Sequence, residues 1–438
     1  MKEKLYKRLQ ESKIYRYRRK RIKKMKKRVS IFSKHGKKLH HFFSPYVFSD
    51  FLERVGAAKE VKHTIVVPDD FSFNTNFDKC IHFFRCLVTS FSRKKGDVVL
   101  DFSRCWNVSV SALTLIKALY YEFMLAQMRY ARMDNMYEMR KLKIHSKVNS
   151  KDVKKYLHSL RLCEFDDFKD EDGEVLSLDL IRGKNRRIYQ ENTKGRAIRE
   201  IVQFINTSLE PVNKSLTPEG LNNIEALVSE ILNNAEDHSH NNCEWYALGI
   251  AFHEKVKGED VVELNLVILN FGDTMYEGFE GTKDLNQENY AIVHRKYNSH
   301  SDLFEENVKF EKESLFMLYM LNEGISRLKF EDDSRGNGTM QFLDAFAQFG
   351  SFGCKNPDFV PQLNVISGHT VLLCDHEVAP YMEGNHLKLS LNKVKDLKLL
   401  PDKEYLKYNC ELFPGTIIEC KIYLNEQFFD EILDDNNE

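Results

Sequence analysis

The stretch that decides the fold is Leu221–His238, LNNIEALVSEILNNAEDH. Its apolar residues recur at i, i+3, i+4 and i+7, which predicts an amphipathic helix over 217–238. Glu230, Asn234 and His238 follow at intervals of four residues, so they share a second face that looks away from the apolar stripe. An amide and a carboxylate one turn apart can ligate Mg²⁺ and orient a water, but the same residues could equally form an ordinary solvated helix face.

Two later segments also carry features of a ligand site. Residues 261–272, VVELNLVILNFG, predict a buried strand that ends in the turn Asn270-Phe271-Gly272, where the backbone can pass close to a ligand. Residues 334–340, SRGNGTM, precede the apolar run QFLDAFAQF and could offer free N–H groups at a helix start to a phosphate. A last strand, TIIECKIYL, opens at Pro414-Gly415-Thr416.

Strand and helix patterns alternate over 60–165, which predicts an α/β domain. The expected strands cover 63–67, 97–102 and 141–145, and the expected helices cover 77–91, 109–129 and 150–160. In the simplest interpretation Ser109 caps the second of these helices. The acidic stretch 166–185 is expected to be a linker.

Residues 186–430 predict a second domain in which strands and helices are segregated, as in an α+β sandwich. The helices are expected near 193–209, 217–238, 311–327 and from Thr339, and the strands near 244–252, 261–270, 362–366, 370–375 and 416–424. The fold class expected for the chain is therefore α/β plus α+β.

The formal charge is zero, from 65 Lys+Arg and 65 Asp+Glu, but it is unevenly distributed. Residues 1–40 hold 18 basic and 2 acidic residues, a net charge of +16, which leaves 47 basic and 63 acidic residues, a net charge of −16, for the rest. The segment 1–41 is thus a basic arm that could bind nucleic acid or another polyanion. It could instead dock on its own acidic body or on anionic lipid.

Composition disfavours several classes of protein. The sequence has no run of apolar residues long enough to cross a membrane and no apolar stretch of a secretory signal behind the basic arm. Nine scattered cysteines without a CxxC pair argue against a disulfide framework and favour a cytoplasmic location. His238, His240 and Cys243 lack a fourth ligand at zinc spacing.

Taken in order, these motifs resemble those of the Bergerat-fold ATPases, the GHKL superfamily of gyrase, histidine kinases and MutL. That family carries ExxxN on a helix, DxGxG after a strand, a glycine-rich turn before a helix and a late Gly-Thr strand. The corresponding segments here are Glu230–Asn234, 270–274, 335–339 and Gly415-Thr416. The resemblance implies an α/β sandwich, made of a mixed sheet with helices on one face, that binds ATP and Mg²⁺.

The resemblance also implies a role for each matched residue. Glu230 matches the general base or water-orienting position, and Asn234 matches the Mg²⁺ ligand. The cofactor-binding set comprises Asn234, His238, Asn270, Gly272, Arg335, Gly336, Gly338, Thr339 and Thr416, with the glycines and Thr339 in the phosphate loop and Thr416 near adenine.

One departure from the family concerns adenine recognition. Asn270 replaces the family's aspartate, and the second glycine of that motif falls at Asp273 or Thr274. An Asn carbonyl can still accept the adenine amino hydrogen, in a neutral and weaker bond. The stretch 273–335 corresponds to the ATP lid, whose His294, Arg295 and Lys296 could contact phosphates or be solvated charges.

Residues 98–113, VVLDFSRCWNVSVSAL, resemble a STAS domain of anti-sigma-factor antagonists. That family places a phosphorylatable serine in a turn before a helix. The matching turn is Ser109-Val110-Ser111, but Val110 stands at the usual acceptor position, which puts a phosphorylation switch in doubt.

The resulting prediction is a cytoplasmic, ATP-binding protein, a Mg-dependent ATPase whose lid closure regulates contacts with another domain, a second copy or a protein partner. The domain combination suggests prokaryotic signalling or anti-phage defence. The alternatives are an anti-sigma-type protein Ser/Thr kinase and a non-hydrolysing nucleic-acid-binding regulator that acts through residues 1–40.

Overall fold

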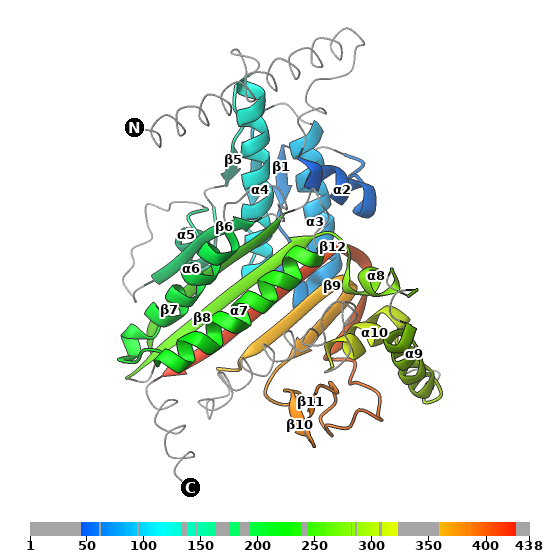
Figure 1. The fold of residues 1–438 in the computed structure, drawn as a ribbon. Coiled ribbons are helices and arrows are strands. Elements are labelled where there is room, and N and C mark those ends of the chain that lie inside the picture. Colours follow the sequence, from blue (N-terminus) through cyan, green and yellow to red (C-terminus); the bar gives the residue numbers. More distant parts are fainter. Residues whose placement is uncertain are drawn as a thin grey trace, which may run out of the picture.

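A five-stranded antiparallel sheet forms the centre of the computed structural model (Figure 1). The structure describes residues 45–425 apart from 61–62, 94–95, 133–137, 146, 163–174, 184–192, 239–243, 257, 282, 285–286, 306–308, 323–358 and 385. The strand order is β6 (Val175–Gly183), β7 (Trp245–Val256), β8 (Glu259–Phe271), β12 (Leu406–Asn425) and β9 (Gln362–Cys374). Every neighbouring pair in this sheet is antiparallel.

Both faces of this sheet are buried. On β7, Trp245, Ala247 and Ala251 enter one core, whereas Tyr246, Leu248 and Phe252 enter a second core on the opposite face. The first core, here called the helix-side core, lies against α6 (Thr193–Thr207) and α7 (Pro218–His238). Because successive strand residues point to opposite faces, two covered faces require a continuous apolar run, as in WYALGIAF and VVELNLVILNF.

The second core is shared with the N-terminal unit, residues 45–162. That unit has a parallel sheet of β1 (Thr64–Val66), β3 (Val98–Asp101) and β5 (Leu142–Ile144), and a parallel pair of β2 (Asp70–Phe71) and β4 (Asn107–Val108). Its helices are α2 (Tyr46–Val55), α3 (Phe73–Arg93), α4 (Val110–Ala131) and α5 (Lys151–Ser159). Phe413 of β12 contacts Phe73 of this unit and Phe271 of β8, with ring centroids 6.3 and 5.9 Å away.

Three helices follow β8 and gather beside the β9 end of the sheet (Figure 1). They are α8 (Met275–Glu280), α9 (Gln287–Ser301) and α10 (Lys312–Leu321). Smaller elements are the 3₁₀ turn η2 (Glu210–Val212) and the hairpin of β10 (Tyr381–Glu383) and β11 (His386–Lys388). The sequence pattern anticipated only the last of the three helices in this stretch.

The observed mixture of helices and several sheets agrees with the expected fold class at the level of α/β plus α+β. Two finer expectations are wrong. The large sheet is antiparallel throughout its described pairs rather than mixed. The described helices of the second domain pack on one face of this sheet, and the N-terminal unit covers the other face. The second half of the expected linker, Val175–Gly183, is the edge strand β6, whereas 163–174 lies outside the described residues.

The element bounds also differ where the chain is irregular. The two strands expected near 362–366 and 370–375 are one strand, β9, and the strand expected at 416–424 is the second half of β12. The helix expected over 311–327 ends at Leu321, where Asn322 is extended. The basic arm, 1–41, and the helix expected from Thr339 lie outside the described residues. Across the part of the chain that is described, no helix has the length and apolarity needed to span a bilayer.

A buried histidine joins α9 to α10 and predicts a pH dependence of stability. The neutral ring of His300 donates from Nε2 to the Leu397 carbonyl, 2.9 Å away, and accepts at Nδ1 from the Tyr319 hydroxyl, 2.6 Å away. Burial lowers the pKa of His300. As the pH falls, His300 is protonated in the unfolded chain first, at a pKa of about 6.5. Its contribution to the free energy of unfolding is therefore complete above that pH.

Below about pH 6.5 this contribution should be lost, by up to ~1.4 kcal/mol per pH unit until the folded-state pKa is reached. Urea unfolding at pH 7.5 and 5.5 measures the effect. His300→Asn should flatten the dependence, and the exposed His63→Asn should leave it as in the wild type. Equal pH dependence in wild type and His300→Asn would contradict the assignment.

Candidate functional site

One row of residues crosses all five strands of the large sheet. Gly183 pairs with Trp245, Trp245 with Asn270, Asn270 with Thr416 and Thr416 with Ser367. Residues paired across antiparallel strands share a face. Trp245 belongs to the helix-side core, so the whole row faces the α7 side of the sheet. Two predicted site residues, Asn270 and Thr416, are therefore neighbours although 146 positions separate them in the sequence.

Asn270 carries an unsatisfied donor in this row. The residue is 3% exposed, and its Nδ2 has no hydrogen-bond partner among the described residues. A buried donor left without a partner costs about 1–3 kcal/mol. The amide is therefore suited to meet an acceptor that the described part of the chain does not supply.

The hydroxyls beside Asn270 form an ordered chain. Ser367 Oγ accepts from the Met275 N–H at 2.9 Å and donates to the Gly415 carbonyl at 3.1 Å. Its only proton is thereby used, so Thr416 must donate in the 3.0 Å contact between the two hydroxyls. The oxygen of Thr416 is left as an acceptor beside the Asn270 amide.

Two glycines bring the backbone together at the end of β8. The Gly272 N–H donates to the Pro414 carbonyl at 3.2 Å. Gly415 has a φ of +153°, and a Cβ there would clash with the Asn270 carbonyl oxygen. The close approach of β8 and β12 thus explains Gly415, and Gly272 has a φ of +151°, a backbone conformation that favours glycine.

Helix α7 lies over the same face of the sheet (Figure 1). Its stripe of Val228, Ile231, Leu232 and Ala235 is buried in the helix-side core. Glu236, one turn beyond Leu232, accepts from Trp245 Nε1 at 3.5 Å and from Lys194 Nζ at 3.1 Å. The C-terminal part of α7 is therefore held directly above the row that contains Asn270.

Glu230 and Asn234 are half-buried on α7, whereas Glu225 and Ala226, one turn earlier, are exposed. Neither residue belongs to the buried stripe of α7. His238 ends the helix, and its side chain lies outside the described residues, as do Arg335, Gly336, Gly338 and Thr339 of the expected phosphate loop. The structure thus places Asn270 and Thr416 under α7, whereas the expected phosphate loop, 335–339, lies outside the described residues.

The basic residues that the sequence singled out in the expected lid, His294, Arg295 and Lys296, lie on α9. His294 packs against Tyr290 and Phe316, with centroids 4.4 and 5.0 Å away, and burial lowers its pKa. Burial also lowers the pKa of Lys296, whereas Arg295 is exposed. His294 is consequently a neutral ring in an aromatic cluster rather than a solvated cation.

Sequence reasoning missed the residue that ties the N-terminal unit to this site. Arg54 of α2 donates to the Gly272 carbonyl and to Glu277 of α8. Glu277 also closes a capping box with Thr274, accepting from the Thr274 N–H at 2.9 Å. The spacing Thr-x-x-Glu could have indicated the start of α8, but no local signal indicates the partner of Arg54.

The turn that resembles a STAS phosphorylation site has a structural role. Ser109 is the N-cap of α4, and its hydroxyl accepts from the Ala112 N–H at 3.2 Å and lies 3.0 Å from the Ser111 hydroxyl. The capping interpretation of Ser109 is therefore confirmed.

Comparison with known proteins adds no relative: no family model, no curated protein and no solved structure matches this chain.

Proposed function

We propose that the chain is an ATP-binding protein, a Mg-dependent ATPase of the Bergerat type. The observation that carries the proposal is the buried Asn270 amide, which has no partner for its Nδ2 and stands beside Thr416 under helix α7. An adenine ring offers both an amino donor and ring-nitrogen acceptors. The Asn270 amide, with one carbonyl and one free NH₂ group, is complementary to such an edge.

The residues of α7 suit the metal and the attacking water. The Asn234 side-chain oxygen is a hard donor of the type that Mg²⁺ prefers, and Mg²⁺ keeps several water ligands when few protein ligands are present. Glu230, one turn earlier on the same half-buried face, would orient or deprotonate a water. Bound Mg²⁺ would supply charge neutralisation at the phosphates.

The Arg54 contacts give the proposed regulation a physical route. Arg54 binds the Gly272 carbonyl at the turn beside Asn270 and so joins α2 to the proposed adenine site. A nucleotide that shifts this turn would change the docking of the N-terminal unit. The same proposal includes contacts with a second copy, with a protein partner or with a polyanion through residues 1–40. It also includes a cytoplasmic location and a role in prokaryotic signalling or anti-phage defence.

Calorimetry with ATP and Mg²⁺ tests the proposal on the full chain. Wild type should bind ATP, and Asn234→Ala should weaken binding in Mg²⁺ by about tenfold or more while changing it little in EDTA. The matched control is the exposed Asn223→Ala on the same helix, which should bind as wild type. Absence of ATP binding by the wild type would overturn the proposal.

Labelled ATP separates the ATPase from the alternatives. Release of free phosphate supports an ATPase, and transfer of the label to a protein would support a Ser/Thr kinase instead. Binding without either, together with a salt-dependent nucleic-acid shift lost on deleting residues 1–40, would support the non-hydrolysing regulator.

A further inference from the structure

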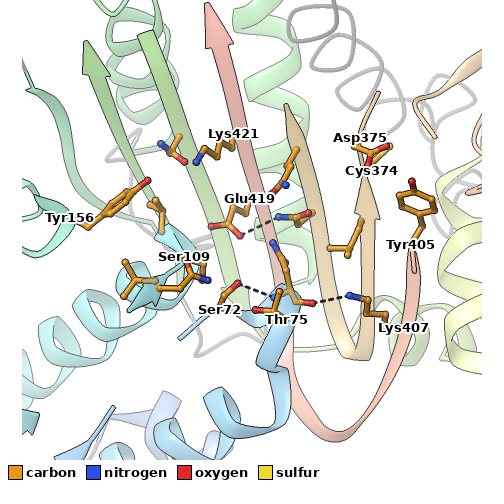
Figure 2. A pocket seen from close by; sticks show the side chains of 18 residues that line it. Ser72, Thr75, Ser109, Tyr156, Cys374, Asp375, Tyr405, Lys407, Glu419 and Lys421 are labelled. Atoms are coloured by element: carbon orange, nitrogen blue, oxygen red, sulfur yellow. Dashed lines mark hydrogen bonds between the residues drawn. The ribbon is translucent and has the colours of Figure 1, made fainter. Parts of the chain in front are cut away.

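A polar cavity of about 360 Å³ lies between the N-terminal unit and the sheet (Figure 2). Its walls come from the start of α3, the turn before α4, α5 and strands β8, β9 and β12. Glu419 and Asn265, which line it, alternate with residues of the helix-side core and therefore face away from α7. The cavity is thus separate from the proposed nucleotide site, which lies on the other face of the sheet.

Glu419 places an unmatched carboxylate in this cavity. The residue is 5% exposed and accepts from the N–H and the hydroxyl of Ser111, each at 2.9 Å, and from Asn364 Nδ2 at 3.5 Å. Within the described ranges no lysine, arginine or histidine forms an ion pair with it. Burial raises the pKa of Glu419, as expected for a buried acid without a counterion.

Lys407 places an unmatched ammonium in the same cavity. Its Nζ donates to the Asn74 carbonyl at 3.1 Å, and it has no carboxylate partner in the described part of the chain. Burial lowers its pKa. Lys421, by contrast, is paired with Glu263 at 3.2 Å, so the cavity's second lysine is already neutralised.

Glu419 and Lys407 are presented to a common space, which Asp375 also lines. The Asp375 carboxylate accepts from the N–H groups of Glu377 and Val378, at 2.9 and 3.4 Å. Figure 2 shows Glu419 and Lys407 directed into the cavity from the two halves of β12. Asn74, which also lines the cavity, has a buried Oδ1 with no hydrogen-bond partner among the described residues. A charge withdrawn from water is costly without a counterion, and Glu419 is buried while Lys407 is half-buried. A ligand with one group of each sign would compensate both.

We propose that this cavity binds a small zwitterion of the α-amino-acid class, with its ammonium at Glu419 and its carboxylate at Lys407. The start of a helix favours an anion, and at α4 this place is taken by Glu419, which accepts from the Ser111 N–H. The ligand's carboxylate therefore lies at Lys407 and its ammonium at Glu419. The volume lies at the small end of ligand pockets, roughly 300–1,000 Å³. Because both units line the cavity, the ligand would strengthen their contact.

Thermal unfolding of the full chain with each common L-α-amino acid, followed by calorimetry, tests the proposal. At least one amino acid should raise the melting temperature and bind 1:1. Its amide, which lacks the carboxylate, and its α-hydroxy acid, which lacks the ammonium, should bind at least about tenfold more weakly. No binding by any amino acid, or equal binding of the half-charged analogues, would overturn the proposal.

Variants assign the two charges. Lys407→Met should weaken binding by about tenfold or more, Lys407→Arg should restore it in part, and the exposed Lys398→Met should bind as wild type. Glu419→Gln should weaken binding to a similar extent, but it also alters the start of α4. If Glu419→Gln does not fold, the result with Lys407→Met decides the test. Wild-type affinity in Lys407→Met would refute the site.

Discussion

Replacing Glu230 by glutamine should lower the rate of ATP hydrolysis by about 10²–10⁴-fold and leave ATP binding nearly unchanged. Glutamine keeps the size of the side chain on the half-buried face of α7 but removes the carboxylate that would orient or deprotonate the water. The effect should therefore fall on turnover and spare affinity. Phosphate release under saturating ATP and Mg²⁺ measures the first, and calorimetry measures the second.

Glu225→Gln is the matched control, because Glu225 lies on the same helix and is exposed. It should hydrolyse ATP at the wild-type rate. Undiminished turnover in Glu230→Gln would remove Glu230 from the reaction. Loss of ATP binding in that variant would instead indicate a role in holding the nucleotide.

The second large effect is expected on stability, from the buried ion cluster at Arg182. Arg182 of β6 contacts Glu122 of α4 and donates to Glu244 at 2.7 Å, and Tyr246 donates to Glu122 at 3.0 Å. The side chains of Glu122 and Glu244 are only 5% and 7% exposed. Arg182→Met would remove this cation from two buried carboxylates, which costs about 3–5 kcal/mol.

Urea unfolding measures this loss. Arg196→Met removes a solvent-exposed pair with Glu200 and should change stability by no more than about 0.5 kcal/mol. Replacing Glu122 and Glu244 by glutamine in the Arg182→Met background should recover part of the stability, since the buried charges are then gone. A cost below about 1 kcal/mol for Arg182→Met would show that water reaches the cluster.

Some parts of the candidate site could be predicted because their signals are local. The i, i+4 spacing of Glu230 and Asn234 places both on one face of α7 in any helix, whatever the helix packs against. The capping role of Ser109 follows in the same way, because an N-cap contacts residues only three positions away. Both predictions agree with the structure.

Other parts could not be predicted because their partners are distant in sequence. The edge strand β6 follows an acidic stretch, and its pairing with β7 spans about 70 residues, so local composition suggested a linker. The first half of β12 mixes polar and apolar residues and contains register shifts near Phe413, which obscure the strand pattern. Arg54 gives no local sign that it binds a carbonyl 218 residues away.

The sequence alone determined the helices with clear periodicity and the buried strands β7 and β8. Periodicity and capping depend on neighbours within one or two turns, which the sequence contains directly. Only the tertiary structure decided that Asn270 and Thr416 share one row, that the N-terminal unit covers the second face of the sheet and that Glu419 and Lys407 enter one cavity. Strand register and packing between units arise from long-range burial, which no local pattern specifies.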